Sequence, residues 1–340
     1  MARILDVRRL RVGFRTKFGQ VNAVNDISFH IDEGEVLAVV GESGSGKSVS
    51  ALSLLGLIAK NGKILGGEID WGGVNLAKLS EAELKNIRGS EISMIFQDPM
   101  SCLNPVLTIG YQMEEALRFH KKDMSKSDRR DRMLEMLEKV KMQNPGERLK
   151  QYPHELSGGM RQRIMIAISL LCQPKLLIAD EPTTALDVTI QAQIMNLIRD
   201  LGEEFNTSVM LITHNLGVVA GMADRVSVMY AGEIVESAPV DEVFYRSGHP
   251  YTQGLIKALP QAGKSGEALV PIPGSTPDLL LEQSGCMFFE RCERAMECCR
   301  DYAPPVYAVS GSQSVKCWIH HPNFAESSAE DGAESEGVDT

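Results

Sequence analysis

The sequence lacks any long hydrophobic run. None of its apolar segments approaches the about 18 residues that a membrane-spanning helix needs. The first ten residues carry charges throughout and contain no apolar signal-peptide core. No internal repeat of fixed period is present either. We therefore expect a chain that does not span a membrane and resides in the cytoplasm.

Basic residues are also in short supply. The 340 residues include 35 Lys and Arg against 45 Asp and Glu, which gives a formal net charge of −10. Several of the acids lie in the stretch 325–340, which has no basic residue and is rich in Ser, Gly and Ala. This composition predicts a disordered acidic tail. The rest of the chain is mildly acidic, so we expect no nucleic-acid partner held by charge.

The body of the chain alternates short apolar runs with helix-like stretches. The runs cover residues 36–40, 92–96, 176–179 and 209–213, and each is followed by a polar loop. Such runs are typical of a parallel, doubly wound α/β sheet that helices cover on both faces. Ligands of these sheets bind beyond the carboxyl ends of the strands.

Two other regions differ from this pattern. Residues 99–155 show helical periodicity, with Met133, Leu134, Leu137 and Val140 on one face of 128–140, so we expect a helical insertion. After Pro239 prolines recur and regular periodicity fades. We therefore expect an α/β core formed by 1–98 and 156–240, the insertion 99–155, a separate C-terminal extension 241–324 and the tail 325–340.

A phosphate-binding loop follows the first run. Residues 41–48 read G-E-S-G-S-G-K-S, which matches G-x-x-x-x-G-K-[ST] in full. The glycines allow successive N–H groups to point at phosphate oxygens, Lys47 neutralises the terminal phosphates, and the Ser48 hydroxyl binds Mg²⁺. A helix over 51–58 adds the partial positive charge of its N-terminal end.

Polar side chains follow the other three runs. Asp180 and Glu181 end the third run, where Asp180 is a candidate Mg²⁺ ligand and Glu181 a candidate general base. Gln97 follows the second run and can contact Mg²⁺ or the attacking water, and His214 follows the fourth and can bind the terminal phosphate. Because parallel strands deliver all of them to one edge of the sheet, we expect a site that hydrolyses a nucleoside triphosphate.

Residues 156–163, L-S-G-G-M-R-Q-R, first read as a Ser-Gly-Gly turn that opens a helix, with Ser157 as its N-cap. The octapeptide resembles the signature motif of ATP-binding cassette ATPases and stands at the family's position, between the phosphate loop and Asp180. Asp187 resembles the family's D-loop residue and His214 its switch histidine, and Phe18 stands where the family places an aromatic that stacks on adenine. The nucleotide contacts expected from the loop and the resemblance together are Phe18, Gly41, Glu42, Ser43, Gly44, Ser45, Gly46, Lys47, Ser48, Val49, Ser157, Gly158, Gly159 and Asp187.

The resemblance implies a P-loop NTPase-type, mostly parallel sheet with an antiparallel N-terminal β subdomain, a helical insertion and a small cysteine-rich C-terminal appendage. It also implies that the signature of one subunit completes the ATP site of another, so that two Mg·ATP lie between paired subunits. A non-transport cassette ATPase is one alternative, although the coiled coils and second cassette of such relatives are absent. A regulatory module that binds ATP without turnover is another, although the catalytic set is complete.

A narrower resemblance concerns residues 152–163, 177–187 and 249–252, which are similar to the ATPase subunits of bacterial oligopeptide and dipeptide importers. Met160, where most cassette ATPases carry Gln, agrees with this subgroup. It implies an ATPase of the translocase class, paired with a different homologous ATPase on two membrane permeases at the cytoplasmic face of the inner membrane. An extracytoplasmic binding protein supplies the substrate, and the nickel importers of the same subgroup leave a second cargo open.

Five of the seven cysteines fall within 286–317. Four thiolates suit Zn²⁺ or an iron–sulfur cluster, and the alternative is a set of free thiols. The segment resembles the C-terminal region of the peptide-importer ATPases, which implies a 4Fe–4S cluster on Cys286, Cys292, Cys299 and Cys317. Cys298, next to Cys299, makes the third ligand ambiguous by one position.

Overall fold

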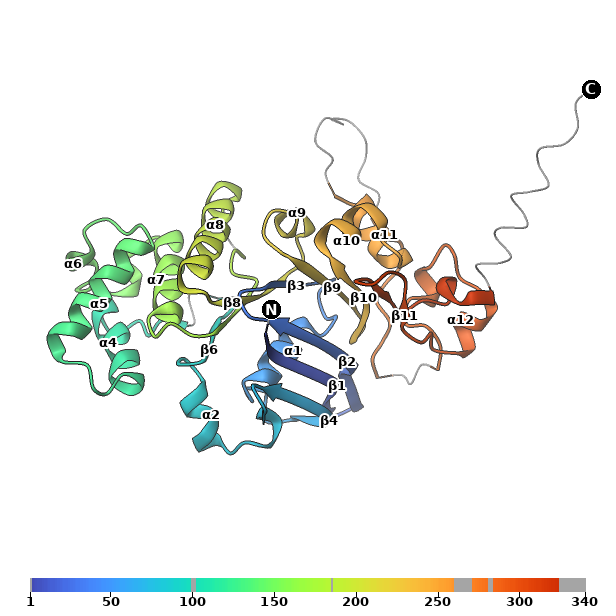
Figure 1. Cartoon of the computed structure of the whole chain (residues 1–340), viewed down its shortest axis with the longest axis horizontal. Helices are drawn as coiled ribbons and strands as arrows, with labels where there is room; N and C mark the ends of the chain where they lie inside the picture. The colour runs from blue at the N-terminus through green and yellow to red at the C-terminus, as the bar shows by residue number, and fades with distance from the viewer. Residues whose placement is uncertain (1, 99–101, 185, 260–270, 281–283, 324–340) are drawn as a thin grey trace, which may run out of the picture.

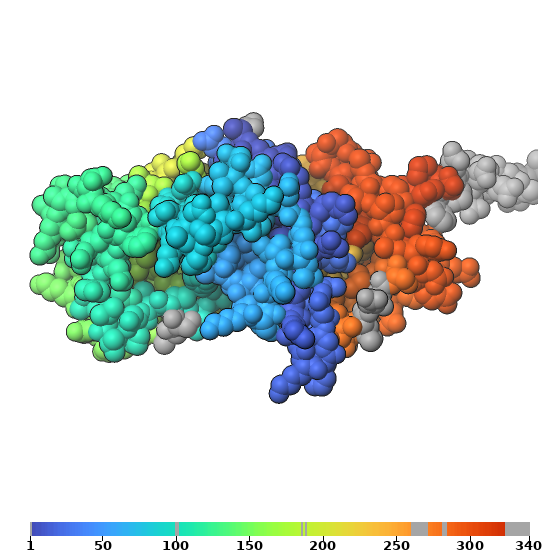
Figure 2. All heavy atoms as spheres, turned by 90° about the horizontal axis from the view of Figure 1, so that it is seen from below, coloured from blue at the N-terminus to red at the C-terminus, as the bar shows by residue number. Residues whose placement is uncertain are grey.

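The structure is a computed structural model, and it describes residues 2–98, 102–184, 186–259, 271–280 and 284–323. The acidic tail expected at 325–340 lies outside the described residues. A central sheet separates a helical region at one end of the molecule from the cysteine-rich segment at the other (Figure 1). The surface view shows the N-terminal part of the chain between these two ends (Figure 2).

The central sheet has eight strands in the order β11-β12-β10-β9-β3-β8-β7-β6. Its parallel strands are β3 (Val36–Val40), β6 (Ile92–Ile95), β7 (Leu176–Asp180), β8 (Ser208–Thr213) and β9 (Arg225–Tyr230). β10 (Glu233–Pro239), β11 (Tyr307–Ala308) and β12 (Ser314–Val315) continue it antiparallel. The predicted mostly parallel sheet is therefore confirmed, and the four predicted runs form its consecutive strands β3, β8, β7 and β6.

A second, antiparallel sheet is formed by the N-terminal strands. Its order is β2-β1-β4-β5, from β1 (Arg3–Thr16), β2 (Gly19–Asp32), β4 (Gly62–Trp71) and β5 (Val74–Asn75). Its apolar face shares one buried cluster with β3 and with α1 (Lys47–Leu54), in which Leu5, Val12 and Leu54 are fully buried. The connection to β6 carries η1 (Leu76–Lys78) and α2 (Glu81–Ile87), which begins at a capping box between Ser80 and Glu83. The antiparallel N-terminal subdomain that the family resemblance implied is confirmed.

Helices occupy the segment between β6 and β7. They are α4 (Ile109–His120), α5 (Lys126–Lys139), α6 (Pro145–Arg148), η2 (Pro153–Glu155) and α7 (Gly158–Leu170). The periodic stretch 128–140 corresponds to α5, which starts earlier because Ser125 caps it in a box with Asp128. Met133 and Leu137 pack into a cluster with α7 and with α8 (Val188–Phe205). None of the helices in the described parts of the chain is long and apolar enough to cross a membrane.

The C-terminal segment is not separate from the core, contrary to the prediction of a separate extension over 241–324. Strand β12 pairs with β10 and extends the central sheet. Phe288 lies in one buried cluster with Tyr230 of β9 and Tyr251 of α11 (Pro250–Lys257). Figure 1 shows α8, α11, α9 (Leu216–Val219) and α10 (Val240–Arg246) on one side of the sheet. The short elements η3 (Phe289–Arg291), α12 (Glu297–Asp301) and η4 (Trp318–His320) complete the segment.

Candidate active site

The phosphate loop joins β3 to α1 and depends on glycine at positions where the backbone is left-handed. Gly41, Gly44 and Gly46 have φ of 152°, 79° and 100°. A Cβ on Gly41 would lie 2.1 Å from the Met229 carbonyl oxygen, and one on Gly46 would lie 2.4 Å from the Ala23 carbonyl oxygen. The loop can therefore keep this path only with glycine at these positions. Helix α1 begins directly after it, so free N–H groups face the loop.

Lys47 lies folded into the loop. Its Nζ donates hydrogen bonds to the carbonyl oxygens of Gly41 and Glu42, each at 2.8 Å, and contacts Ser45 Oγ at 3.4 Å. The side chain is buried, and burial lowers the pKa of Lys47, while Glu181 and Asp180 oppose that shift. A buried ammonium group held only by carbonyl and hydroxyl oxygens is available to a phosphate anion.

Ser48 and Asp180 meet across the site. Ser48 Oγ donates to Asp180 Oδ1 at 2.9 Å, and Asp180 is 5% exposed at the end of β7. Burial raises the pKa of Asp180, and the Ser48 hydrogen bond opposes this shift. A hydroxyl and a carboxylate side by side fit Mg²⁺, since this ion binds through one or two protein oxygens together with the phosphates of its nucleotide.

Glu181 contacts three other side chains. His214 Nδ1 lies 3.1 Å from its Oε1, while Gln97 Nε2 and Thr184 Oγ1 donate to its Oε2 at 3.0 and 2.9 Å. Its backbone is left-handed, with φ of 45°. Burial alone would raise the pKa of Glu181, but the hydrogen bonds from His214 and Thr184 outweigh it and lower the pKa. An ionised carboxylate can accept a proton, so Glu181 can act as a general base. Thr184 was not among the predicted site residues, and its position three residues after Glu181 is the only sequence signal for it.

The predicted signature residues do not contact the phosphate loop of this chain. Ser157 caps α7 by accepting from the Met160 N–H at 3.3 Å, so its expected N-cap role is present. Gly158 and Gly159 face Leu186 and Ile190 of the neighbouring segment rather than the phosphate loop, and Ser157 and Gly158 are exposed. An exposed helix N-terminus is an anion site that this chain's own loop does not fill.

Three other predicted contacts have distinct surroundings. Phe18 lies in the turn between β1 and β2 and is 87% exposed, so it is not a core residue. Asp187 is the exposed N-cap residue of α8. Val49 is a half-buried residue of α1 that packs against the N-terminal cluster.

The Glu42 side chain contacts the C-terminal segment. Arg291 pairs with it, with Nη1–Oε2 and Nη2–Oε1 distances of 2.8 and 3.0 Å, and the Glu42 N–H donates to the Tyr251 hydroxyl at 3.0 Å. Of the remaining loop residues, Ser43 and Gly44 are exposed, and the Ser45 N–H donates to the Glu42 carbonyl oxygen at 3.3 Å. No sequence pattern singled out Arg291, which lies 249 positions from Glu42.

The cysteine segment gathers four thiols. The Cys286 N–H donates to the Cys299 carbonyl oxygen at 2.7 Å. Burial, assisted by the nearby thiols of Cys299, Cys317 and Cys292, raises the pKa of Cys286 to about 12. Burial likewise raises the pKa of Cys317 to about 11. Cys299 is buried and adds to the raised pKa of each of the other three, which favours it over the less buried Cys298 as their companion.

By donor chemistry these thiols fit a soft metal or an iron–sulfur cluster. Their arrangement in the structure does not form a metal site. Among the described residues, no group of three or more His, Cys, Asp or Glu side chains is placed to hold a metal ion.

Comparison with known proteins agrees with this geometry. Residues 24–184 match the family described as "ABC transporter", and residues 235–299 match the family described as "Oligopeptide/dipeptide transporter, C-terminal region". The oligopeptide transport ATP-binding protein OppD of Salmonella typhimurium is 52% identical over 93% of this chain and 93% of its own length. The chain belongs to the ATP-binding cassette family of transporter ATPases.

Further relatives of this cassette ATPase are similar over nearly their whole length. The dipeptide transport ATP-binding protein DppD of Bacillus subtilis is 50% identical over 94% of this chain and 95% of its own. A solved structure described as a dimeric, post-hydrolysis state of the ATP-binding cassette MJ0796 bound to ADP and Pi has a TM-score of 0.63 at 29% identity. It covers 70% of this chain and 99% of its own. The predicted cassette ATPase fold is thereby confirmed.

Proposed function

We propose that this chain is the ATP-hydrolysing subunit of a bacterial ABC importer for oligopeptides or dipeptides. The observation that supports it most directly is the convergence of Lys47, Ser48–Asp180 and Glu181 at one edge of the sheet. The relatives named above are peptide transport proteins, so we propose peptides rather than nickel as the cargo.

In this proposal each residue has one task. The loop N–H groups and Lys47 bind the phosphates, and Ser48 with Asp180 holds Mg²⁺, which neutralises charge on the phosphates when bound. Glu181 accepts a proton from the attacking water, and His214 and Gln97 keep its carboxylate in place until the nucleotide engages them. Phe18 stacks on the adenine ring, because its aromatic side chain is exposed in the turn between β1 and β2 and is free to contact a ligand.

The exposed Ser157–Gly159 turn supports a site shared between two subunits. We propose that this turn and Asp187 contact the ATP held by a second, homologous cassette, and that two permeases and an extracytoplasmic binding protein complete the importer. The chain then works as a peripheral subunit at the cytoplasmic face of the membrane, and 99–155 is the region that meets the permeases. The similar cassette MJ0796 was solved as a dimer with ADP and Pi.

We also propose that Cys286, Cys292, Cys299 and Cys317 hold a 4Fe–4S cluster. To bind it, their four sulfur atoms would have to move closer together than they are in this structure. The support is four neighbouring, largely buried thiols in the segment that matches the peptide-transporter C-terminal region. Iron and acid-labile sulfide analysis after anaerobic purification tests it, and one zinc ion per chain without iron would refute it.

The function is tested by Glu181→Gln in the assembled importer. Loss of the general base is expected to lower ATP turnover at least about 100-fold while ATP stays bound. Glu68→Gln is the matched control, because Glu68 is an exposed carboxylate of β4 that pairs with Arg8. Normal hydrolysis by the Glu181→Gln importer would refute the assignment of the base.

A further inference from the structure

The phosphate loop is in contact with a part of the chain that no ATP-site motif covers. Glu42, its second residue, makes a bidentate ion pair with Arg291 of η3, at 2.8 and 3.0 Å. Two parallel hydrogen bonds between a guanidinium and a carboxylate combine charge with fixed geometry. The cysteine-rich segment is therefore joined directly to the loop that binds the phosphates.

The Arg291 side chain is buried and has several contacts besides Glu42. Its side chain is 5% exposed, and its Nε donates to the Pro273 carbonyl oxygen at 2.8 Å. Its Nη1 donates to the Tyr230 hydroxyl at 3.3 Å, and its guanidinium lies 5.6 Å from the Tyr230 ring centre and 5.9 Å from that of Phe288. These contacts hold the guanidinium in the position from which it pairs with Glu42.

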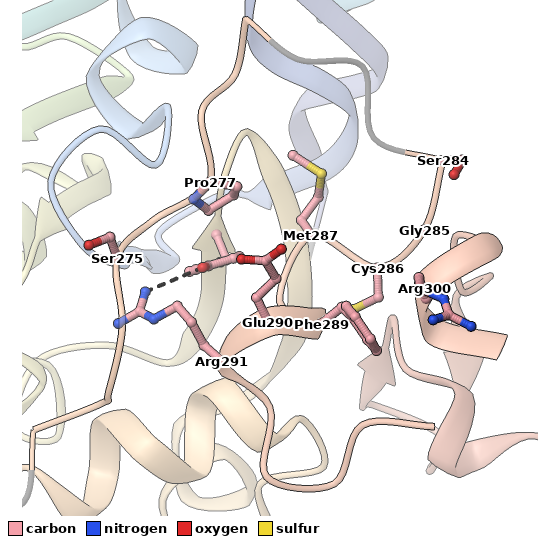
Figure 3. Close-up of a pocket in the computed structure, with 11 residues that line it drawn as sticks. Ser275, Pro277, Ser284, Gly285, Cys286, Met287, Phe289, Glu290, Arg291 and Arg300 are labelled. Atoms are coloured by element: carbon pink, nitrogen blue, oxygen red, sulfur yellow. Dashed lines mark hydrogen bonds between the residues drawn. The ribbon is translucent and has the colours of Figure 1, made fainter. Parts of the chain in front are cut away.

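Arg291 also differs from the second arginine at the same cavity. The cavity has a volume of about 280 Å³, and Figure 3 shows Arg291 and Arg300 on opposite sides of it, with Cys286 between them. The Arg300 side chain is 63% exposed and pairs only with its neighbour Asp301, at 3.5 Å, among the ion pairs of the described residues. The two arginines share a segment and a cavity, but one alone reaches the phosphate loop.

The charge of Glu42 gives this contact a consequence for ATP. A carboxylate in a loop that binds three phosphates repels the ligand unless a cation neutralises it. At the same time the loop backbone at Glu42 is fixed by the Tyr251 hydroxyl, and its carbonyl oxygen accepts from Lys47. Freeing the Glu42 side chain would thus add negative charge near the phosphates and loosen the residue that positions Lys47.

We propose that Arg291 is a positioning residue of the ATP site: it neutralises Glu42 and fixes the phosphate loop, so that the C-terminal segment sets the affinity for ATP. The proposal rests on the proposed function and deepens it, since it makes the cysteine-rich segment a control element for nucleotide binding. It depends on no metal, because every contact in it is between side chains and backbone of this chain.

The test compares ATP binding by the purified full-length chain and four variants, with a fluorescent ATP analogue and with ATP in competition. Arg291→Gln is expected to raise the Kd about tenfold, because it leaves the Glu42 carboxylate unneutralised. The double variant Glu42→Gln/Arg291→Gln removes that carboxylate as well and is expected to return the Kd to within about threefold of the wild type. Arg291→Lys keeps the positive charge but cannot make two parallel hydrogen bonds to the carboxylate. Its Kd is expected to lie between those of the double variant and of Arg291→Gln.

Arg300→Gln is the matched control, and its Kd is expected to equal that of the wild type. In the assembled importer Arg291→Gln should raise the KM for ATP by the same factor as the Kd and change kcat by less than about twofold, because Glu181 and its partners are untouched. An arginine with a merely structural role would instead lower kcat, because less of the enzyme would be active, and the double variant would not restore it.

The outcomes separate this inference from the function itself. A wild-type chain that does not bind ATP refutes the proposed function. A wild type that binds ATP together with an Arg291→Gln variant of equal Kd refutes the role of Arg291, and so does a double variant as weak as Arg291→Gln. If Arg291→Gln does not fold, Arg291→Lys takes its place, and a Kd equal to that of the wild type refutes the proposal.

Discussion

His249 is a buried histidine whose uncharged form the fold requires. The residue is 1% exposed, and its Nδ1 accepts the Tyr251 N–H at 3.0 Å, which caps the first turn of α11. The backbone N–H of His249 donates to the buried carboxylate of Glu236 at 2.9 Å, and its ring centre lies 5.9 Å from that of Phe288. A proton on Nδ1 would remove the acceptor that the helix cap needs.

Burial, assisted by the nearby His320, lowers the pKa of His249 from 6.5 to about 3. The unfolded chain therefore binds a proton at this residue from pH 6.5 downward, whereas the folded chain binds it only near pH 3. The protonation of His249 therefore leaves the stability unchanged above pH 6.5. It lowers the stability as the pH drops from 6.5 toward about 3, the folded pKa. At pH 5 the difference of 1.5 pH units corresponds to a loss of about 2 kcal/mol, at 1.36 kcal/mol for each unit.

The perturbation is His249→Asn, since asparagine also caps helices through a side-chain oxygen but does not titrate. Urea unfolding of the full chain at pH 7 and pH 5, followed by the fluorescence of its two tryptophans, measures the pH-dependent loss of stability. The variant is expected to lose about 2 kcal/mol less than the wild type between these pH values, while the exposed exchange His154→Asn leaves the wild-type loss unchanged. An equal loss in the wild type and in His249→Asn would refute the reasoning.

Two further predictions concern the nucleotide site. Gly46→Ala is expected to weaken ATP binding at least about tenfold, because its Cβ would lie 2.4 Å from the Ala23 carbonyl oxygen at a φ of 100°. Gly146→Ala, whose Cβ meets nothing within 4 Å, should bind ATP as the wild type does. If Gly46→Ala also bound ATP with the wild-type affinity in a titration, the strained-loop argument would be contradicted. Asp180→Asn is expected to weaken binding of ATP at least about tenfold in the presence of Mg²⁺ but not in EDTA, because it removes the carboxylate beside Ser48. Equal Mg²⁺ dependence in the variant and the wild type would count against Asp180 as a ligand.

The parts of this fold that local patterns determine could be predicted from the sequence. The apolar runs became β3, β6, β7 and β8 within one or two residues, because strands buried on both faces need continuous apolar side chains. The G-x-x-x-x-G-K-[ST] pattern of residues 41–48 identified the phosphate loop without any tertiary information, and its glycines at 41, 44 and 46 have positive φ in the structure. Parallel strand ends then brought Gln97, Glu181 and His214 together as expected.

Features that depend on distant pairing could not be predicted in this way. Strands β11 and β12 have two residues each, too few for a period-two pattern, so the sequence predicts a C-terminal segment separate from the core. The left-handed backbone of Glu181 has no signature, because glycine is the residue that marks such positions. The Arg291–Glu42 pair joins residues far apart in the chain, and an arginine beside cysteines carries no local sign of its partner.

The order of the central sheet explains why this distant contact exists. The loop that binds phosphate follows β3, whose neighbour is β9, and β9 in turn pairs with β10. Tyr230 ends β9 beside that loop, and the turn after it leads into β10, to which the cysteine-rich segment returns through β12. A segment that packs Phe288 on Tyr230 therefore lies one strand from the phosphate loop, within reach of an arginine side chain. The C-terminal pairing of β12 with β10 thus determines the contact, and a change that detaches β12 should weaken ATP binding in the same way as Arg291→Gln.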